Sequence, residues 1–276
     1  MNYYTANKIS EHVTQITSLT NEFLYLIEGK LEAVLIDTCL GIGNLRAFVE
    51  SLTSKPITVI LTHGHVDHAM GAPEFERVYM SSKDNPVFME HSDLEVRKEY
   101  IAMALGDKAP KLDDGDYVQA TNPDFMELKE GDRFDLGGIQ LEIYAAGGHT
   151  PGTMAVLIVE ERSLILGDAC NHSTFLFDKN SYSVEKYRAS MEQLDVSTKG
   201  KYDQVYLCHH EAVAPREILQ QIIILCNEIM KRETDDVPFE FMGQISYFAK
   251  AVDKNLKRLD GGLGNIIYNA DNIFEK

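Results

Sequence analysis

Three histidines and one aspartate stand within six consecutive residues, in the segment HGHVDH at positions 63–68. The whole chain has only nine histidines among 276 residues, so this segment holds a third of them. Neutral imidazole and carboxylate are the usual ligands of zinc, and of iron or manganese in mixed nitrogen and oxygen sites. His63 and His65 alternate along an extended backbone and can point to one side, whereas Asp67 and His68 follow where the chain must bend. The segment can therefore supply two ligands to one metal ion and two to a second.

Further metal-competent residues follow apolar, strand-like runs, as His63 does. The runs and the residues after them are ITVILT with His63, IQLEIYAA with His149, SLILG with Asp168, and DQVYLC with His209. We expect these strand ends to bring their loops together at one edge of the sheets. Gly147 and Gly148 precede His149, and we expect them to allow unusual φ values where the backbone presents that ligand.

The elements that must position these residues are read from the hydrophobic pattern. Two strand-like runs flank Gly29 and Lys30 and predict a hairpin. Further short strands are expected at residues 57–62, 77–81, 139–146, 154–159, 163–169 and 202–210. Helical spacing predicts helices over residues 44–52 and 85–105, and one that begins at Pro215. The tail from residue 235 to 276 mixes short helix and strand signals.

The formal net charge of −17 limits the partners. A surface this acidic repels phosphate backbones and anionic lipid headgroups, so we expect neither nucleic acid nor a membrane as partner. A small-molecule substrate remains the expected partner, and the sequence leaves room for a homo-oligomer. Bound divalent cations would offset part of the negative charge.

The cysteines and the first residues indicate a compartment. Four scattered cysteines form no C-x-x-C pair, which fits reduced thiols (Cys39, Cys170, Cys208 and Cys226). The start, MNYYTANKIS, lacks the basic and apolar regions of a signal peptide, and no apolar run reaches the length of a membrane span. We therefore expect a cytoplasmic protein.

Four motifs together resemble a known family. HGHVDH matches the H-x-H-x-D-H signature of the metallo-β-lactamase superfamily, and GGHTPGTMAVLI, LILGDA and VYLCHHEAV resemble its later motifs in the family's order. The set covers about residues 21–213 and is similar to the hydroxyacylglutathione hydrolase and lactonase-like branches. The resemblance implies the α/β class with an αββα sandwich. It also implies one domain over residues 1–276, with residues 214–276 as its helical and strand extension.

The resemblance also implies a ligand set and a mechanism. One metal would be held by His63, His65 and His149, the other by Asp67, His68 and His209, and Asp168 would bridge the two. The implied cofactors are two divalent ions, zinc first, with iron or manganese as alternatives. A metal-bridging hydroxide would attack the substrate, and Asp67 would orient it and carry its proton as the catalytic acid and base.

The last motif departs from the family pattern, because CHHE contains two adjacent histidines. One alignment makes His209 the ligand and His210 the stand-in for a glycine. The other alignment makes His210 the ligand. We favour His209.

These features favour a dinuclear metal-dependent hydrolase of an ester, thioester, lactone or related bond. An alternative is a mononuclear iron enzyme that resembles the persulfide dioxygenases of the same superfamily. A phosphodiesterase is disfavoured by the acidic surface, and a noncatalytic binding module is disfavoured because no ligand position is missing. Substrate choice is expected to lie in residues 85–124, in residues 171–199 and in the C-terminal tail.

Overall fold

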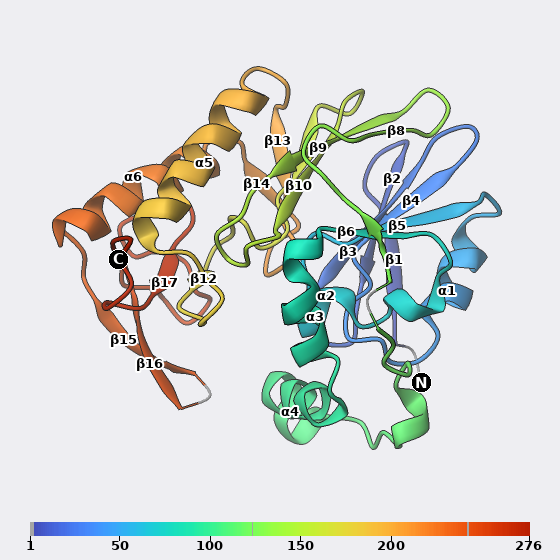
Figure 1. Ribbon diagram of the computed structural model, residues 1–276, viewed down its shortest axis with the longest axis horizontal. Coiled ribbons are helices and arrows are strands. Elements are labelled where there is room, and N and C mark those ends of the chain that lie inside the picture. The colour runs from blue at the N-terminus through green and yellow to red at the C-terminus, as the bar shows by residue number, and fades with distance from the viewer. Residues whose placement is uncertain (1–2, 123, 242) are drawn as a thin grey trace. The chain divides into compact units, whose positions relative to one another are not determined.

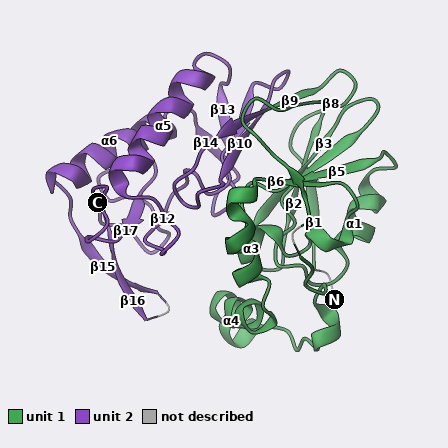
Figure 2. Ribbon diagram, in the orientation of Figure 1, with its two compact units in different colours: residues 1–142 green, residues 143–276 purple. Residues whose placement is uncertain are grey.

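The computed structural model describes residues 3–122, 124–241 and 243–276 (Figure 1). The chain divides into two compact units, residues 1–142 and 143–276 (Figure 2). The boundary between the units falls within strand β9 (Gln140–Ala145). In the part of the chain that the structure describes, no helix combines the length and the apolar character needed to cross a bilayer.

The first unit is built on a seven-stranded sheet with the order β1 to β7. Its strands are β1 (Thr5–Lys8), β2 (Val13–Thr17), β3 (Phe23–Glu28), β4 (Ala33–Ile36), β5 (Ile57–Ile60), β6 (Val78–Met80) and β7 (Met126–Glu127). Strands β1 to β4 pair antiparallel, and β4 to β7 pair parallel. Because β4 and β5 are parallel neighbours, the residues that follow both strands emerge at the same edge of the sheet.

The predicted hairpin is confirmed by strands β3 and β4, which pair with Glu28 opposite Ala33. Side chains alternate between the two faces of a strand, and Leu24, Leu26 and Leu35 belong to one hydrophobic cluster. Every residue of β4 is buried. The sheet therefore holds the chain firmly up to the point where Asp37 follows β4.

Helices cover one face of this sheet. They are α1 (Leu45–Leu52), α2 (Val66–Ala69), α3 (Asn85–His91) and α4 (Leu94–Leu105), with short 3₁₀ turns at Ala72–Glu74, Ser82–Asp84, Gly106–Lys108 and Asp114–Asp116. The prediction of one helix over residues 85–105 is wrong in its continuity. The chain breaks at Ser92, and Asp93 starts α4 by accepting a hydrogen bond from the backbone N–H of Glu95.

A six-stranded sheet has the order β14-β13-β11-β10-β9-β8. Besides β9 it contains β8 (Arg133–Asp135), β10 (Met154–Ile158), β11 (Ser163–Ile165), β13 (Gln204–Tyr206) and β14 (Val213–Pro215). The predicted pairing of β10 with β11 is confirmed. Pro215 does not begin a helix as predicted. It ends strand β14, where it lies opposite Gln204 of β13, and the next helix begins only at Ile218.

Two long helices pack together in the second unit, α5 (Val184–Thr198) and α6 (Ile218–Lys231). Their buried side chains share one hydrophobic cluster with Leu157, Leu164 and Val205 of the sheet. A second sheet has the order β12-β17-β16-β15, formed by β12 (Thr174–Leu176), β15 (Val237–Phe241), β16 (Gln244–Phe248) and β17 (Ile266–Tyr268). The mixed signals of the tail thus correspond to strands, with no helix in its described residues.

Candidate metal centre

The histidine segment bends as its sequence predicts. His63 and His65 lie in the extended connection after β5, His65 is the residue before α2, and Asp67 and His68 lie inside that helix. The rings of His63 and His68 have centroids 4.1 Å apart, and His63 and His65 offer nitrogen atoms within 4.8 Å of each other. Oδ2 of Asp67 lies 3.7 Å from Nε2 of His68, so the first unit brings its four predicted ligands together.

Asp37 fixes the last histidine of the segment, and the sequence reasoning missed it. Its carboxylate accepts hydrogen bonds from the backbone N–H of Thr62 (2.7 Å) and from Nδ1 of His68 (2.8 Å). A carboxylate only accepts, so the His68 Nδ1 carries the proton and Nε2 is left as the ligand atom. That Nε2 lies 3.7 Å from Oδ2 of Asp67. An aspartate directly after the fully buried run AVLI was the available signal.

Two further residues that hold the histidine segment in place come from residues 84–91, in which the sequence contains no recognisable motif. Asp84 accepts a hydrogen bond from the backbone N–H of Gly64 (2.9 Å), and Nδ1 of His91 accepts one from Val66 (3.0 Å). The His91 ring stacks on His65 with centroids 4.6 Å apart. A Cβ on Gly64 would lie 2.9 Å from the Asp84 carbonyl oxygen, so only glycine fits this approach. These contacts hold the segment on both sides of its bend.

Tyr100 on α4 contacts the predicted catalytic aspartate. Its hydroxyl lies 2.9 Å from Oδ2 of Asp67 and 3.1 Å from Oε1 of Glu22. Burial raises the pKa of the Tyr100 hydroxyl well above its usual value, and the charges of Asp67 and Glu22 raise it further. The hydroxyl is therefore protonated at neutral pH and available as a donor.

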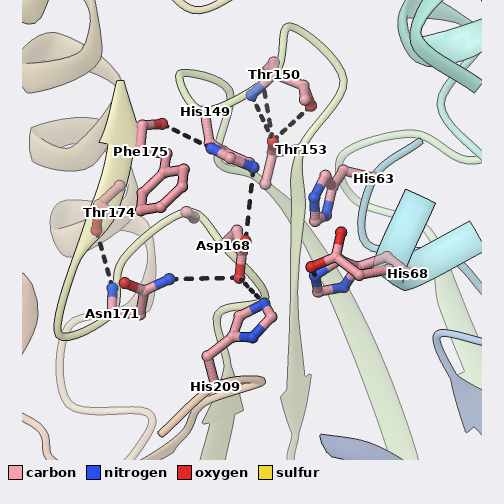
Figure 3. Close-up of polar contacts among 12 residues, drawn as sticks. His63, His68, His149, Thr150, Thr153, Asp168, Asn171, Thr174, Phe175 and His209 are labelled. Carbon is pink, nitrogen blue, oxygen red and sulfur yellow. Dashed lines mark hydrogen bonds and ion pairs between the residues drawn. The ribbon is translucent and has the colours of Figure 1, made fainter. Parts of the chain in front are cut away.

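In the second unit, His149 follows β9 and is fixed by the main chain. Its Nδ1 lies 2.7 Å from the carbonyl oxygen of Phe175 on β12, and because a carbonyl only accepts, Nδ1 is the donor (Figure 3). Gly147 and Gly148 were expected to allow unusual φ values, and neither has a positive φ. Gly148 is needed for another reason, since a Cβ there would overlap the ring of the fully buried Tyr187.

Asp168 stands between two imidazoles of the same unit (Figure 3). Its Oδ2 lies 3.5 Å from Nε2 of His149, and its Oδ1 lies 3.2 Å from Nε2 of His209. Nδ2 of Asn171 donates to Oδ1 at 3.3 Å. The second unit therefore brings its three predicted ligands together, and Asn171 adds a support that no sequence signal indicated.

These distances are those expected between ligands of one metal ion. Two ligand atoms about 2.0–2.1 Å from a tetrahedral zinc lie roughly 3.3 Å apart. The Asp168 contacts are 3.2 and 3.5 Å long, and the Asp67–His68 contact is 3.7 Å long. Since Nδ1 of His149 donates to the Phe175 carbonyl, Nε2 is the ring nitrogen that faces the Asp168 carboxylate. A cation stabilises that arrangement, so the donor set fits a divalent metal.

The adjacent histidines differ in backbone conformation. His210 has φ 64°, in the left-handed region that favours glycine. His209, not His210, contacts Asp168 in the ion pairs of the described residues. Burial lowers the pKa of the His210 imidazole, and His209 and His172 lower it further. This geometry supports the alignment in which His210 stands where a glycine is usual.

Known proteins with similar sequences and folds identify the family of the chain. Residues 19–199 match the family model of the Metallo-beta-lactamase superfamily. The acyl-coenzyme A thioesterase MBLAC2 of Bos taurus is 26% identical over 216 residues, which are 67% of this chain and 72% of that protein. The human MBLAC2 is 24% identical over the same shares. A metallo-beta-lactamase structure from Pontibacter korlensis has a TM-score of 0.60 at 20% identity, over 80% of this chain and 97% of that one.

The chain belongs to the metallo-beta-lactamase superfamily, because the family model matches more than half of its length. The predicted αββα fold class is confirmed by that match and by the solved structures that share the fold. The chain is an enzyme of this superfamily, a metal-dependent hydrolase, as the motifs predicted.

Proposed function

We propose that the chain is a dinuclear metal-dependent hydrolase that cleaves an ester, thioester, lactone or related bond of a small-molecule substrate. The position of Asp168 carries this proposal, because its two oxygens face two different predicted ligands, His149 and His209. A carboxylate that turns one oxygen to each side is suited to bridge two ions.

We infer the ligand sets from the motifs that the chain shares with its family. His63, His65 and His149 would hold one ion, and Asp67, His68 and His209 would hold the other, with Asp168 shared. The fixed Nδ1 atoms of His68 and His149 support these sets, since they reserve Nε2 for a metal. When bound, two divalent ions, zinc first, supply Lewis-acid polarisation of the substrate carbonyl and lower the pKa of a bound water.

The side chains of this chain would perform the remaining tasks. Asp67 would hold a proton taken from the attacking water and deliver it to the leaving group. Asp37, Asn171 and the Phe175 carbonyl would hold the ligands in place.

Among these carbonyl substrates, we place thioesters first, because the MBLAC2 relatives are named acyl-coenzyme A thioesterases. The four cysteines are buried thiols. They favour a reducing compartment such as the cytoplasm.

A metal and substrate analysis tests the proposal. Purified protein saturated with zinc, manganese or iron should contain two ions per chain and should hydrolyse at least one member of a panel of esters, acyl-coenzyme A thioesters and lactones. One ion per chain after saturation, together with oxygen uptake on a persulfide, would instead indicate the iron dioxygenase. No turnover of any carbonyl substrate by the two-metal form would contradict the proposed reaction.

A further inference from the structure

We propose that Tyr100 is a positioning residue for Asp67, held in place by Glu22 and by helix α4. This inference rests on the proposed function, since it assumes that Asp67 binds a metal ion and carries a proton.

Tyr100 contacts Oδ2 of Asp67, which is the oxygen that faces His68. Its hydroxyl lies 2.9 Å from Oδ2, and the same Oδ2 is 3.7 Å from Nε2 of His68. A hydroxyl that donates to this oxygen fixes the rotation of the carboxylate, so that Oδ2 stays directed toward the position shared with His68. Partners of this kind orient a metal ligand without touching the metal.

Glu22 holds the hydroxyl from the other side. The Glu22 side chain is buried, and its Oε2 accepts hydrogen bonds from the hydroxyls of Ser18 and Thr20. Its Oε1 lies 3.1 Å from the Tyr100 hydroxyl, whose single proton is shared between this oxygen and Oδ2 of Asp67. Both oxygens of Glu22 thus have hydrogen-bond partners, and the carboxylate cannot rotate away without losing these contacts. Burying a carboxylate is costly unless such partners are present, which points to a specific purpose at this position.

Tyr100 lies on the side of helix α4 that Arg97 attaches to neighbouring backbone. Arg97 lies three residues earlier, on the same side of the helix. Its guanidinium donates to the carbonyl oxygens of Leu40, Gly41 and Val118. The Arg97 side chain is 2% exposed, so these contacts tie α4 to the chain that follows β4. The same helix face therefore carries both an anchor and the tyrosine that reaches Asp67.

Tyr100→Phe keeps the ring and removes only the donor. We expect its affinity for the metal ion held by Asp67 to fall about 10–100-fold, the usual loss when an outer partner of a ligand is removed. Direct titration with cobalt or zinc measures this without turnover. With the enzyme fully loaded, kcat should fall with little change in KM, and most for substrates with poor leaving groups, because these need the proton from Asp67.

Tyr4→Phe is the matched control. Tyr4 is also buried in the first unit, and its hydroxyl donates to the Ile42 carbonyl oxygen at 2.6 Å. Its loss should lower stability and leave metal affinity and the leaving-group dependence unchanged. Glu22→Gln retains an acceptor for Tyr100 and should resemble the wild-type protein, whereas Glu22→Leu should show a weaker form of the Tyr100→Phe defect. Glu22→Leu also tests the inference if Tyr100→Phe does not fold.

The outcomes separate this inference from the proposed function. If the wild-type protein binds two metals and hydrolyses its substrate, but Tyr100→Phe matches Tyr4→Phe in both titration and leaving-group dependence, the positioning role is wrong. A wild-type protein that binds no divalent metal overturns the proposed function itself, and the premise of the inference with it.

Discussion

At the scale of single residues, the site is defined by which atom of each ligand is left to face a metal. Asp37 accepts a hydrogen bond from Nδ1 of His68, and the Phe175 carbonyl accepts one from Nδ1 of His149. These partners lie far from their histidines in the sequence, so no local motif could indicate them. The predicted ligands could be named from short motifs such as HGHVDH, whereas the hydrogen-bond partners that orient them depend on pairing across the sheets.

Asp67 gives the most direct residue-scale prediction. Asp67→Asn keeps the shape of the side chain but cannot accept a proton, so turnover should fall at least about 100-fold, the lower end of a general acid and base contribution. Steady-state rates measured with elemental analysis of the same samples test this. Full activity at unchanged metal content would remove Asp67 from proton transfer.

The two adjacent histidines give a second prediction. His209→Ala should weaken metal binding by at least about 10-fold, since losing even an outer partner of a ligand has that effect. His210→Gly should retain the metals, because glycine adopts the φ of 64° found there without strain. Metal titration of both variants shows which of the two histidines binds the metal. Loss of metal in His210→Gly alone would show that the other alignment of CHHE is correct.

At the scale of elements, the strands were predicted better than the connections between them. The hairpin β3–β4, helix α1 and strand β5 follow from short apolar runs and helical spacing, and the structure confirms them. The helix over residues 85–105 splits because Asp93 satisfies a backbone N–H and starts a new helix. The role of Tyr100 was not predictable, because it requires α4 to lie against Asp67 and Glu22.

The approach of α5 to the turn before His149 gives an element-scale prediction. Gly148→Ala would drive a methyl group into the ring of Tyr187, which is fully buried and cannot move aside. We expect a loss of about 1–3 kcal/mol in the free energy of unfolding, as for other overpacked sites. Urea denaturation measures it. Gly115→Ala is the control, because no atom lies within 4 Å of a Cβ there. Equal stability of the two variants would show that this approach is not tight.

At the scale of the whole molecule, the acidic composition and the predicted metal ligands both favour the binding of divalent cations. The chain has a formal net charge of −17, and like charges repel one another in a compact state. The predicted ligands include Asp67 and Asp168, and Asp37 is buried beside His68. Divalent ions would neutralise carboxylates that folding has already brought together. Membership of the family was predictable from four motifs, but the substrate was not, because the segments expected to choose it contain no recognisable pattern.

Metal removal should therefore destabilise the entire fold. A ligand that binds only the folded state stabilises it by about 2.7 kcal/mol at 100 times its dissociation constant. For a chain of this length, that corresponds to a fall in Tm of roughly 5 °C after chelation. Calorimetry of chelated and reloaded protein measures the shift, and sodium chloride at matched ionic strength controls for simple screening. Because His209→Ala lacks a ligand, its Tm should respond less to reloading. An unchanged Tm in protein shown to have lost its metals would mean that these ions do not hold the folded state together.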